Sequence, residues 1–183
     1  MMNKRNIFLG VALLISVTTA YAQTFTLKST DLGGQFSNEF IAGNFGCNGQ
    51  NHSPQLQWTN APTGTKSYAV TMYDADAPTG SGFWHWVIVD IPLNIIELKR
   101  DAGKLKNDLA PKGSLQSVND TGAAGYQGPC PGEGEAPHHY LITVYALDVE
   151  KLGTTSTTTA ALTGFLLGTH TLAKASLLVY CKR

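Results

Sequence analysis

The stretch from residue 68 to residue 92 reads YAVTMYDADAPTGSGFWHWVIVDIP and contains two runs of strand-forming residues. Residues 68–73 are rich in β-formers, and so are residues 85–91, which end at Pro92. Proline lacks the backbone N–H that a sheet interior requires, so it marks the end of the second run. A polar segment with two glycines joins the runs. The pattern therefore predicts two adjacent strands whose connection carries polar side chains at one end of a sheet.

Strand patterns recur along the rest of the chain, at residues 24–28, 55–58, 139–147 and 176–181. In the first two segments apolar and polar residues alternate, as expected for half-buried strands. The last two have a strand-like composition. Residues 103–128 are polar and turn-rich without a sustained period, so we expect a long surface excursion there.

One segment near the C-terminus has helical spacing instead. Residues 157–167 place apolar side chains at helical intervals, Gly168 is a candidate helix stop, and a second short helix is expected near Thr171. With 183 residues and no internal repeat, the chain has the size of one domain. The sequence predicts a single mostly-β domain with a small helical segment near its C-terminus.

Residues 1–22 have the features of a secretory signal peptide. Two basic residues precede an almost wholly apolar run at residues 7–17, and residues 20–22 (Ala-Tyr-Ala) form a small-x-small cleavage site. The apolar run has about half of the roughly 20 residues needed to span a bilayer. We therefore expect removal of residues 1–22 and export of residues 23–183 to the periplasm or the medium, with no transmembrane segment in the mature chain.

The charge balance bears on the kind of partner. The chain has 13 Lys plus Arg and 13 Asp plus Glu, a formal net charge of zero. Removal of residues 1–22 leaves 11 basic against 13 acidic side chains, a net charge of −2. Because binding to a phosphate polymer depends on a basic surface, no nucleic-acid partner is expected.

Two clusters of polar residues could carry chemistry. The first, residues 74–78 (Asp-Ala-Asp-Ala-Pro), follows a predicted strand and precedes His85 at the start of the next one. The second is the turn-rich loop at residues 128–137, which leads into His138-His139-Tyr140. Side chains alternate along a strand, so His138 and Tyr140 share a face and His139 points away. His139 and the other histidines, His52 and His170, are expected at the surface or in structural roles.

The order and spacing of these motifs resemble those of the phosphatidylethanolamine-binding protein family. Within the family, the chain is similar to the bacterial YbhB/YbcL branch, which is often labelled Raf kinase inhibitor-like. Residues 51–58 (NHSPQLQW) are similar to the family's Asn-x-Ser-Pro-x-Leu-x-Trp segment. Residues 74–78 resemble its Asp-Pro-Asp-Ala-Pro signature, with His85 as the pocket histidine that follows. Residues 138–140 resemble its closing His-x-Tyr motif. The resemblance covers nearly the whole mature chain.

The resemblance implies an antiparallel β-sandwich with a small cavity at one end that holds a phosphate or another small anion. Carried over residue by residue, the ligand-binding set is Asp74, His85, Pro131, Gly132, His138 and Tyr140. Imidazole and phenol groups suit this role, because they donate strong hydrogen bonds to phosphate oxygens. A carboxylate at an anion site needs a separate reason, so we expect Asp74 to orient His85 and to raise the pKa of its imidazole.

The chain departs from the family pattern at two places. Ala75 replaces a proline, although a cis bond between Ala77 and Pro78 of the kind the family shows is expected to persist. Gly132 stands where the family usually has the second proline of a Pro-Pro pair. Glycine adds a backbone N–H at this place, which could face the anion.

Three cysteines leave one unpaired in an exported protein, and the sequence by itself does not fix the pairing. The resemblance implies a bridge from Cys47 to Cys130, since both positions are typical of its exported branch. Cys181 would then be the free thiol. Such a bridge would hold the loop that carries Pro131 and Gly132.

Three functions follow from these observations. The favoured one is a binding protein without catalytic activity, cofactor or metal, whose ligand is a small phosphorylated or otherwise anionic group such as phosphoethanolamine. The second is a hydrolase that uses Asp74, His85 and His138, together with Asp76, as a metal site or an acid/base set. It is disfavoured because the sequence has neither a helical His-x-x-x-His or comparable pair of metal ligands nor a Gly-x-Ser-x-Gly elbow. The third is an interaction or inhibitor protein that acts on the surface of a partner protein.

Overall fold

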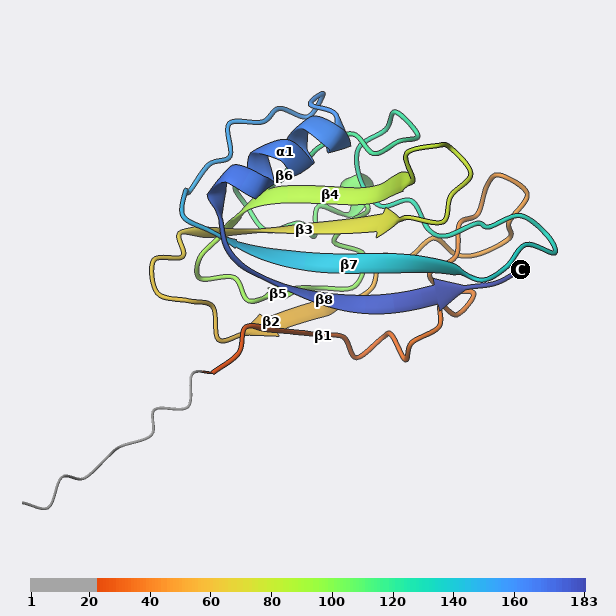
Figure 1. The fold of residues 1–183 in the computed structure, drawn as a ribbon, viewed down its shortest axis with the longest axis horizontal. Coiled ribbons are helices and arrows are strands. Elements are labelled where there is room, and N and C mark those ends of the chain that lie inside the picture. Colours follow the sequence, from red (N-terminus) through yellow and green to blue (C-terminus); the bar gives the residue numbers. More distant parts are fainter. Residues whose placement is uncertain (1–22) are drawn as a thin grey trace, which may run out of the picture.

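The computed structural model describes residues 23–183, and the predicted signal peptide at residues 1–22 lies outside the described residues. The described chain forms two antiparallel sheets and one α-helix (Figure 1). A three-stranded sheet has the order β1-β2-β5, with β1 (Thr26–Lys28), β2 (Leu56–Thr59) and β5 (Glu97–Leu98). A five-stranded sheet has the order β6-β4-β3-β7-β8, and its strands are β6 (Leu115–Gln116), β4 (Phe83–Pro92), β3 (Ser67–Asp74), β7 (His138–Leu147) and β8 (Thr171–Cys181).

The main core lies between the two sheets. Alternate residues of the long strands point into it, so that Val70 and Met72 of β3 pack with Trp86 of β4 and Trp58 of β2. A smaller cluster on the other face of the five-stranded sheet packs under the helix α1 (Ala160–His170), which contributes Ala160 and Leu167 to it. The predicted mostly-β domain with one helical segment near the C-terminus is confirmed.

The prediction for residues 168–175 was wrong in two respects. The helix continues through Gly168 to His170, and no second helix begins at Thr171. Instead β8 begins there and pairs with β7 along its whole length, from Thr171 opposite Leu147 to Cys181 opposite His138. The long ladder with β7 outweighs the weak local preference of these residues for a helix.

Residues 103–128 are only partly a surface excursion. The first part contains a short 3₁₀ helix (Leu105–Asn107) and is exposed, but Ser117, Asn119 and Tyr126 are buried. Asn119 donates from Nδ2 to the carbonyl of Gly125 at 3.0 Å. Polar side chains such as Asn119 form the hydrogen bonds that the buried backbone of this segment needs. The segment is therefore partly buried although its sequence has no apolar periodicity.

Within residues 23–183, no helix is long and apolar enough to cross a membrane.

Candidate functional site

A cavity of about 360 Å³ opens at one end of the five-stranded sheet. β3 and β8 end there, and β4 and β7 begin there, at the right-hand side of Figure 1 near the C-terminus. All six residues of the predicted ligand-binding set line the cavity, which is otherwise walled mostly by loop residues. The lining consists of Phe45, Asp74, Ala77, Pro78, Thr79, Phe83, His85, Gln127, Gly128, Cys130, Pro131, Gly132, Glu135, His138 and Tyr140.

A β-bulge brings His85 to the cavity. Met72 pairs with Trp86 and Tyr73 pairs with Trp84, so the ladder between β3 and β4 skips His85. In a regular strand His85 would share a face with Val87, under α1. The extra residue instead lets the His85 ring lie 5.1 Å from the ring of Tyr140, whereas Trp84 packs in the cluster under the helix.

Asp74 pairs with His138 and not with His85. Its Oδ2 lies 2.9 Å from His138 Nδ1, and its Oδ1 accepts a hydrogen bond from the backbone N–H of Asp76 at 2.9 Å. The side chains are 3% and 9% exposed for Asp74 and His138, so the pair is shielded from solvent. An imidazole whose Nδ1–H donates to this carboxylate directs Nε2 toward the cavity.

The predicted rise in the pKa of His85 was also wrong. His85 Nδ1 lies 2.9 Å from the carbonyl oxygen of Gln127, to which it donates. Burial lowers the pKa of His85, because it disfavours the charged imidazolium more than the nearby acceptors and the charge of Asp74 favour it. His85 is therefore neutral at pH 7, with Nε2 as its unprotonated nitrogen.

Tyr140 keeps its proton at all ordinary pH values. Burial raises the pKa of its phenol strongly, and the negative charge of Asp74 raises it further. Its ring also packs edge-on against Phe36, with centroids 5.4 Å apart. A side-chain hydrogen bond to Asp74 also contributes to the raised pKa, so the hydroxyl is a neutral donor beside this carboxylate.

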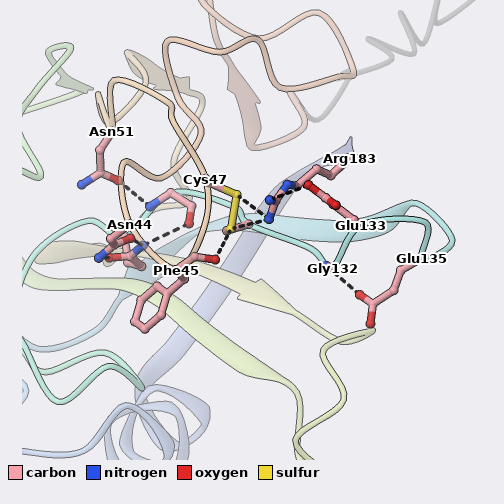
Figure 2. The surroundings of a disulfide bond; sticks show 11 residues. Asn44, Phe45, Cys47, Asn51, Gly132, Glu133, Glu135 and Arg183 are labelled. Atoms are coloured by element: carbon pink, nitrogen blue, oxygen red, sulfur yellow. Dashed lines mark hydrogen bonds and ion pairs between the residues drawn. A yellow bond between two sulfur atoms is a disulfide. The ribbon is translucent and has the colours of Figure 1, made fainter.

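Gly132 lines the cavity, but its backbone N–H already donates to the side chain of Glu135, a residue that the sequence motifs did not indicate. Gly132 donates to Oε2 of Glu135 at 2.8 Å (Figure 2). The same oxygen lies 3.2 Å from Nε2 of His138. Glu135 precedes His138 by three residues within a turn, and this spacing gave no signal of the contact.

The predicted disulfide between Cys47 and Cys130 is confirmed, and Cys181 is a free, buried thiol. Figure 2 shows that the bridge joins two loops that also share side-chain contacts. Asn44 and Gln127 exchange hydrogen bonds, and Asn51 Oδ1 accepts from the N–H of Gly128 at 2.7 Å.

The end of the chain reaches the same loops. The Arg183 guanidinium lies 3.6 and 3.7 Å from the two sulfur atoms of the Cys47–Cys130 bridge and 2.9 Å from Glu133 (Figure 2). Arg183 itself does not line the cavity, but it contacts the loops whose residues Phe45, Cys130 and Pro131 do.

The loop after β3 differs from the expectation in its backbone. Residues 23–183 contain no cis peptide bond, so the bond between Ala77 and Pro78 is trans. Asp76 lies outside the cavity lining and bonds His139, whose Nδ1 is 2.8 Å from Asp76 Oδ2.

The remaining histidines have the structural roles expected for them. His52 pairs with Asp101 at 2.8 Å and His170 with Asp148 at 3.0 Å. In the part of the chain that the structure describes, no group of three or more His, Cys, Asp or Glu side chains is arranged to hold a metal ion.

Comparison with known proteins places the chain in a family. Residues 26–182 match the sequence model of the family described as phosphatidylethanolamine-binding protein. The chain is 41% identical over 175 residues to YbcL of Escherichia coli K12, which covers 94% of this chain and 96% of YbcL. It is 42% identical over 153 residues to YbhB of the same organism, which covers 82% of this chain and 96% of YbhB.

Solved structures agree with this placement. The crystal structure of E. coli YbcL has a TM-score of 0.85 at 42% identity, over 87% of this chain and 98% of that one. A homologue from Chlamydia trachomatis shares the fold with a TM-score of 0.71 at 24% identity, over 87% of this chain and 97% of its own. The chain belongs to the phosphatidylethanolamine-binding protein family, as its motifs predicted.

Proposed function

We propose that the protein binds a small anion in the cavity, either phosphate or a phosphorylated headgroup such as phosphoethanolamine, and does not catalyse a reaction. The observation that carries the proposal is the buried pair of Asp74 and His138, in which Nδ1 is 2.9 Å from the carboxylate. The pair holds the ring so that Nε2 serves a ligand in the cavity. The ligand named for the family supports the same chemistry.

The donors around His138 suit a phosphate group. The N–H of Gly132 lies on the same side of the cavity, and the protonated hydroxyl of Tyr140 lies at its buried end. Hydrogen bonds from such groups to a charged oxygen are strong in a shielded site. A few local donors are enough for one small anion, so the net charge of zero for the whole chain is no obstacle.

The side chains that line the cavity favour binding over hydrolysis. A hydroxyl or thiol nucleophile must be free and close to a base. Of the lining residues, Thr79 donates its hydroxyl to the carbonyl of Gly82, and Cys130 is in the disulfide. The raised pKa of Tyr140 keeps its phenol protonated.

One observation nevertheless favours a hydrolase as a second candidate. A carboxylate on Nδ1 of a histidine is the arrangement that orients a general base, which could here activate water. Asp74 and His138 have this geometry. Turnover of p-nitrophenyl phosphate by the protein, lost in His138→Ala, would establish the hydrolase and overturn the binding proposal.

The binding proposal includes export. The Cys47–Cys130 disulfide fits an oxidising compartment, and the sequence of residues 1–22 fits a signal peptide that leaves the domain at residues 23–183 in the periplasm or the medium. Expression of the full chain in bacteria, followed by fractionation and intact-mass measurement, tests this. Recovery of uncleaved protein in the cytoplasm would contradict it.

The binding test is calorimetry with inorganic phosphate and with phosphoethanolamine, on protein purified after expression of the full chain. We expect His138→Ala to weaken binding at least about tenfold, the cost of one charge-assisted hydrogen bond. His170→Ala is the matched control, because His170 also pairs with an aspartate but at the end of α1. Equal affinity of the His138→Ala variant and the unsubstituted protein would overturn the proposal.

A further inference from the structure

We propose that Glu135 is a built-in occupant of the anion site, and that a ligand binds by displacing its carboxylate from Gly132 and His138. The inference rests on the proposed function, since it takes these two groups as donors to the ligand. It adds that the site is closed by a negative group of the protein itself.

The contacts of Glu135 are those of a bound anion. Its Oε2 accepts the N–H of Gly132 at 2.8 Å and lies 3.2 Å from Nε2 of His138. The Glu135 side chain is 43% exposed, whereas the imidazole it reaches is 9% exposed. The carboxylate therefore extends from the solvent side onto a buried donor, at the entrance to the cavity.

Gly132 is shaped for this contact. A Cβ atom at position 132 would lie 2.7 Å from Cδ of Glu135 and 2.9 Å from both of its carboxylate oxygens. These distances are too short for any residue with a side chain unless Glu135 moves. A proline at position 132 would also lack the N–H that the carboxylate accepts. The contact with Glu135 in this geometry therefore depends on the glycine at position 132.

The neighbouring acid of the same turn has a different environment. Glu133 is 78% exposed and pairs with Arg183 at 2.9 Å (Figure 2), and it does not line the cavity. Arg183 thus compensates Glu133, whereas the charge of Glu135 lies against the ligand donors. Two carboxylates two residues apart provide a test residue and a matched control.

A tethered group competes at a high effective concentration, in the millimolar range for short flexible connections. The competition lowers the affinity of every small anion by the same factor, so a ligand must bond these donors more strongly than a carboxylate to displace Glu135 at low concentration, as a phosphate with more acceptor oxygens can. Glu135 would therefore set the affinity of the site.

The experiment is calorimetry with inorganic phosphate on Glu135→Ala, Glu135→Gln, Glu133→Ala and the unsubstituted protein. We expect Glu135→Ala to bind phosphate about tenfold more tightly, because the donors are free. Glu135→Gln should lie between Glu135→Ala and the unsubstituted protein, since an amide oxygen still accepts from Gly132 but without charge. Glu133→Ala should stay within about twofold, as expected for an exposed charge that salt screens.

The outcomes separate this inference from the proposed function. If phosphate binds, depends on His138 and is unaffected by Glu135→Ala, the displacement is wrong and the binding function stands. If Glu135→Ala and Glu133→Ala strengthen phosphate binding equally, or if Glu135→Gln and Glu135→Ala bind phosphate with equal affinity, the effect is one of charge alone. Either result refutes the proposal that Glu135 occupies the anion site. If no variant binds phosphate, the proposed function itself fails. Melting temperatures of the variants, compared with that of the unsubstituted protein, show whether the substitutions leave the fold intact.

Discussion

Asp74 and His138 are diagonal neighbours on one face of the ladder between β3 and β7. Asp74 stands opposite Tyr140, and His138 lies two residues earlier on β7, so both of these β7 side chains point to the cavity beside Asp74. This relationship explains why Asp74 serves His138, whereas the backbone of Gln127 serves His85. It also makes the function of the carboxylate testable.

Substitution Asp74→Asn should weaken phosphate binding about tenfold although it removes a negative charge near the anion. An amide in place of the carboxylate accepts a weaker hydrogen bond from Nδ1 of His138, so it orients the imidazole less firmly toward the cavity. Calorimetry at pH 7 measures the change. Asp76→Asn is the control, because Asp76 pairs with the exposed His139 and lies outside the cavity. Tighter binding by Asp74→Asn would show that repulsion dominates and would contradict this prediction.

The buried His85 should make the protein less stable as the pH falls. Its pKa in the folded state is lowered by burial, so below about pH 6.5 the unfolded chain takes up a proton that the folded chain does not. The free energy of unfolding should therefore decrease below this pH, by at most about 1.4 kcal/mol per pH unit for one proton. Urea unfolding at pH 7.5 and pH 5.5 measures the slope.

The control for that slope is the variant His85→Gln. Its free energy of unfolding should depend less on pH in this range. The carboxyl groups with lowered pKa, Asp76 and Asp101, give stability that is lost only below their unfolded values near pH 4, so they do not act in this window. An identical slope in the variant would show that another group controls the pH dependence.

Loss of the Cys47–Cys130 bridge should reduce both stability and binding. The double variant Cys47→Ser/Cys130→Ser should lose about 2–4 kcal/mol of unfolding free energy. It should also bind phosphate more weakly, because Cys130, Pro131 and Gly132 line the cavity. Urea unfolding and calorimetry measure the two effects. Unchanged binding in a destabilised variant would mean that the loop is held by its hydrogen bonds alone.

Cys181 should be inert in the folded protein. Its thiol is buried, and burial together with the charge of Asp74 raises its pKa to about 11. A thiol reacts as the thiolate, so iodoacetamide at pH 8 should leave Cys181 unmodified until denaturant is added. Mass spectrometry of the protein with and without denaturant reports the modification. Rapid alkylation without denaturant would show that β8 opens readily.

Much of the fold follows from local patterns in the sequence. The runs around residues 68–73, 85–91 and 139–147 form long, buried strands, because β-formers and alternation act within one segment. The extent of α1 was not predictable in this way. Its last turn and the start of β8 depend on pairing with β7, which is a contact distant in sequence.

The site was predictable as a set of residues but not as a set of contacts. The resemblance to the family gave six of the fifteen residues that line the cavity, and the alternation of β7 placed His138 on the same face as Tyr140. The bulge at His85 shifts that side chain to the other face of β4, which composition does not reveal. The contact from Glu135 depends on the conformation of a turn with few local signals. The partner of each imidazole therefore required the structure.

The position of the odd cysteine has a consequence for how the chain matures. Cys181 belongs to β8, the last strand, and stays exposed until β8 docks on β7. Until then its thiolate can attack one sulfur of a Cys47–Cys130 disulfide that has already formed, which gives a mixed disulfide and releases the other sulfur as a thiolate. Once β8 is paired, the burial of Cys181 and the raised pKa of its thiol protect the Cys47–Cys130 disulfide from this exchange.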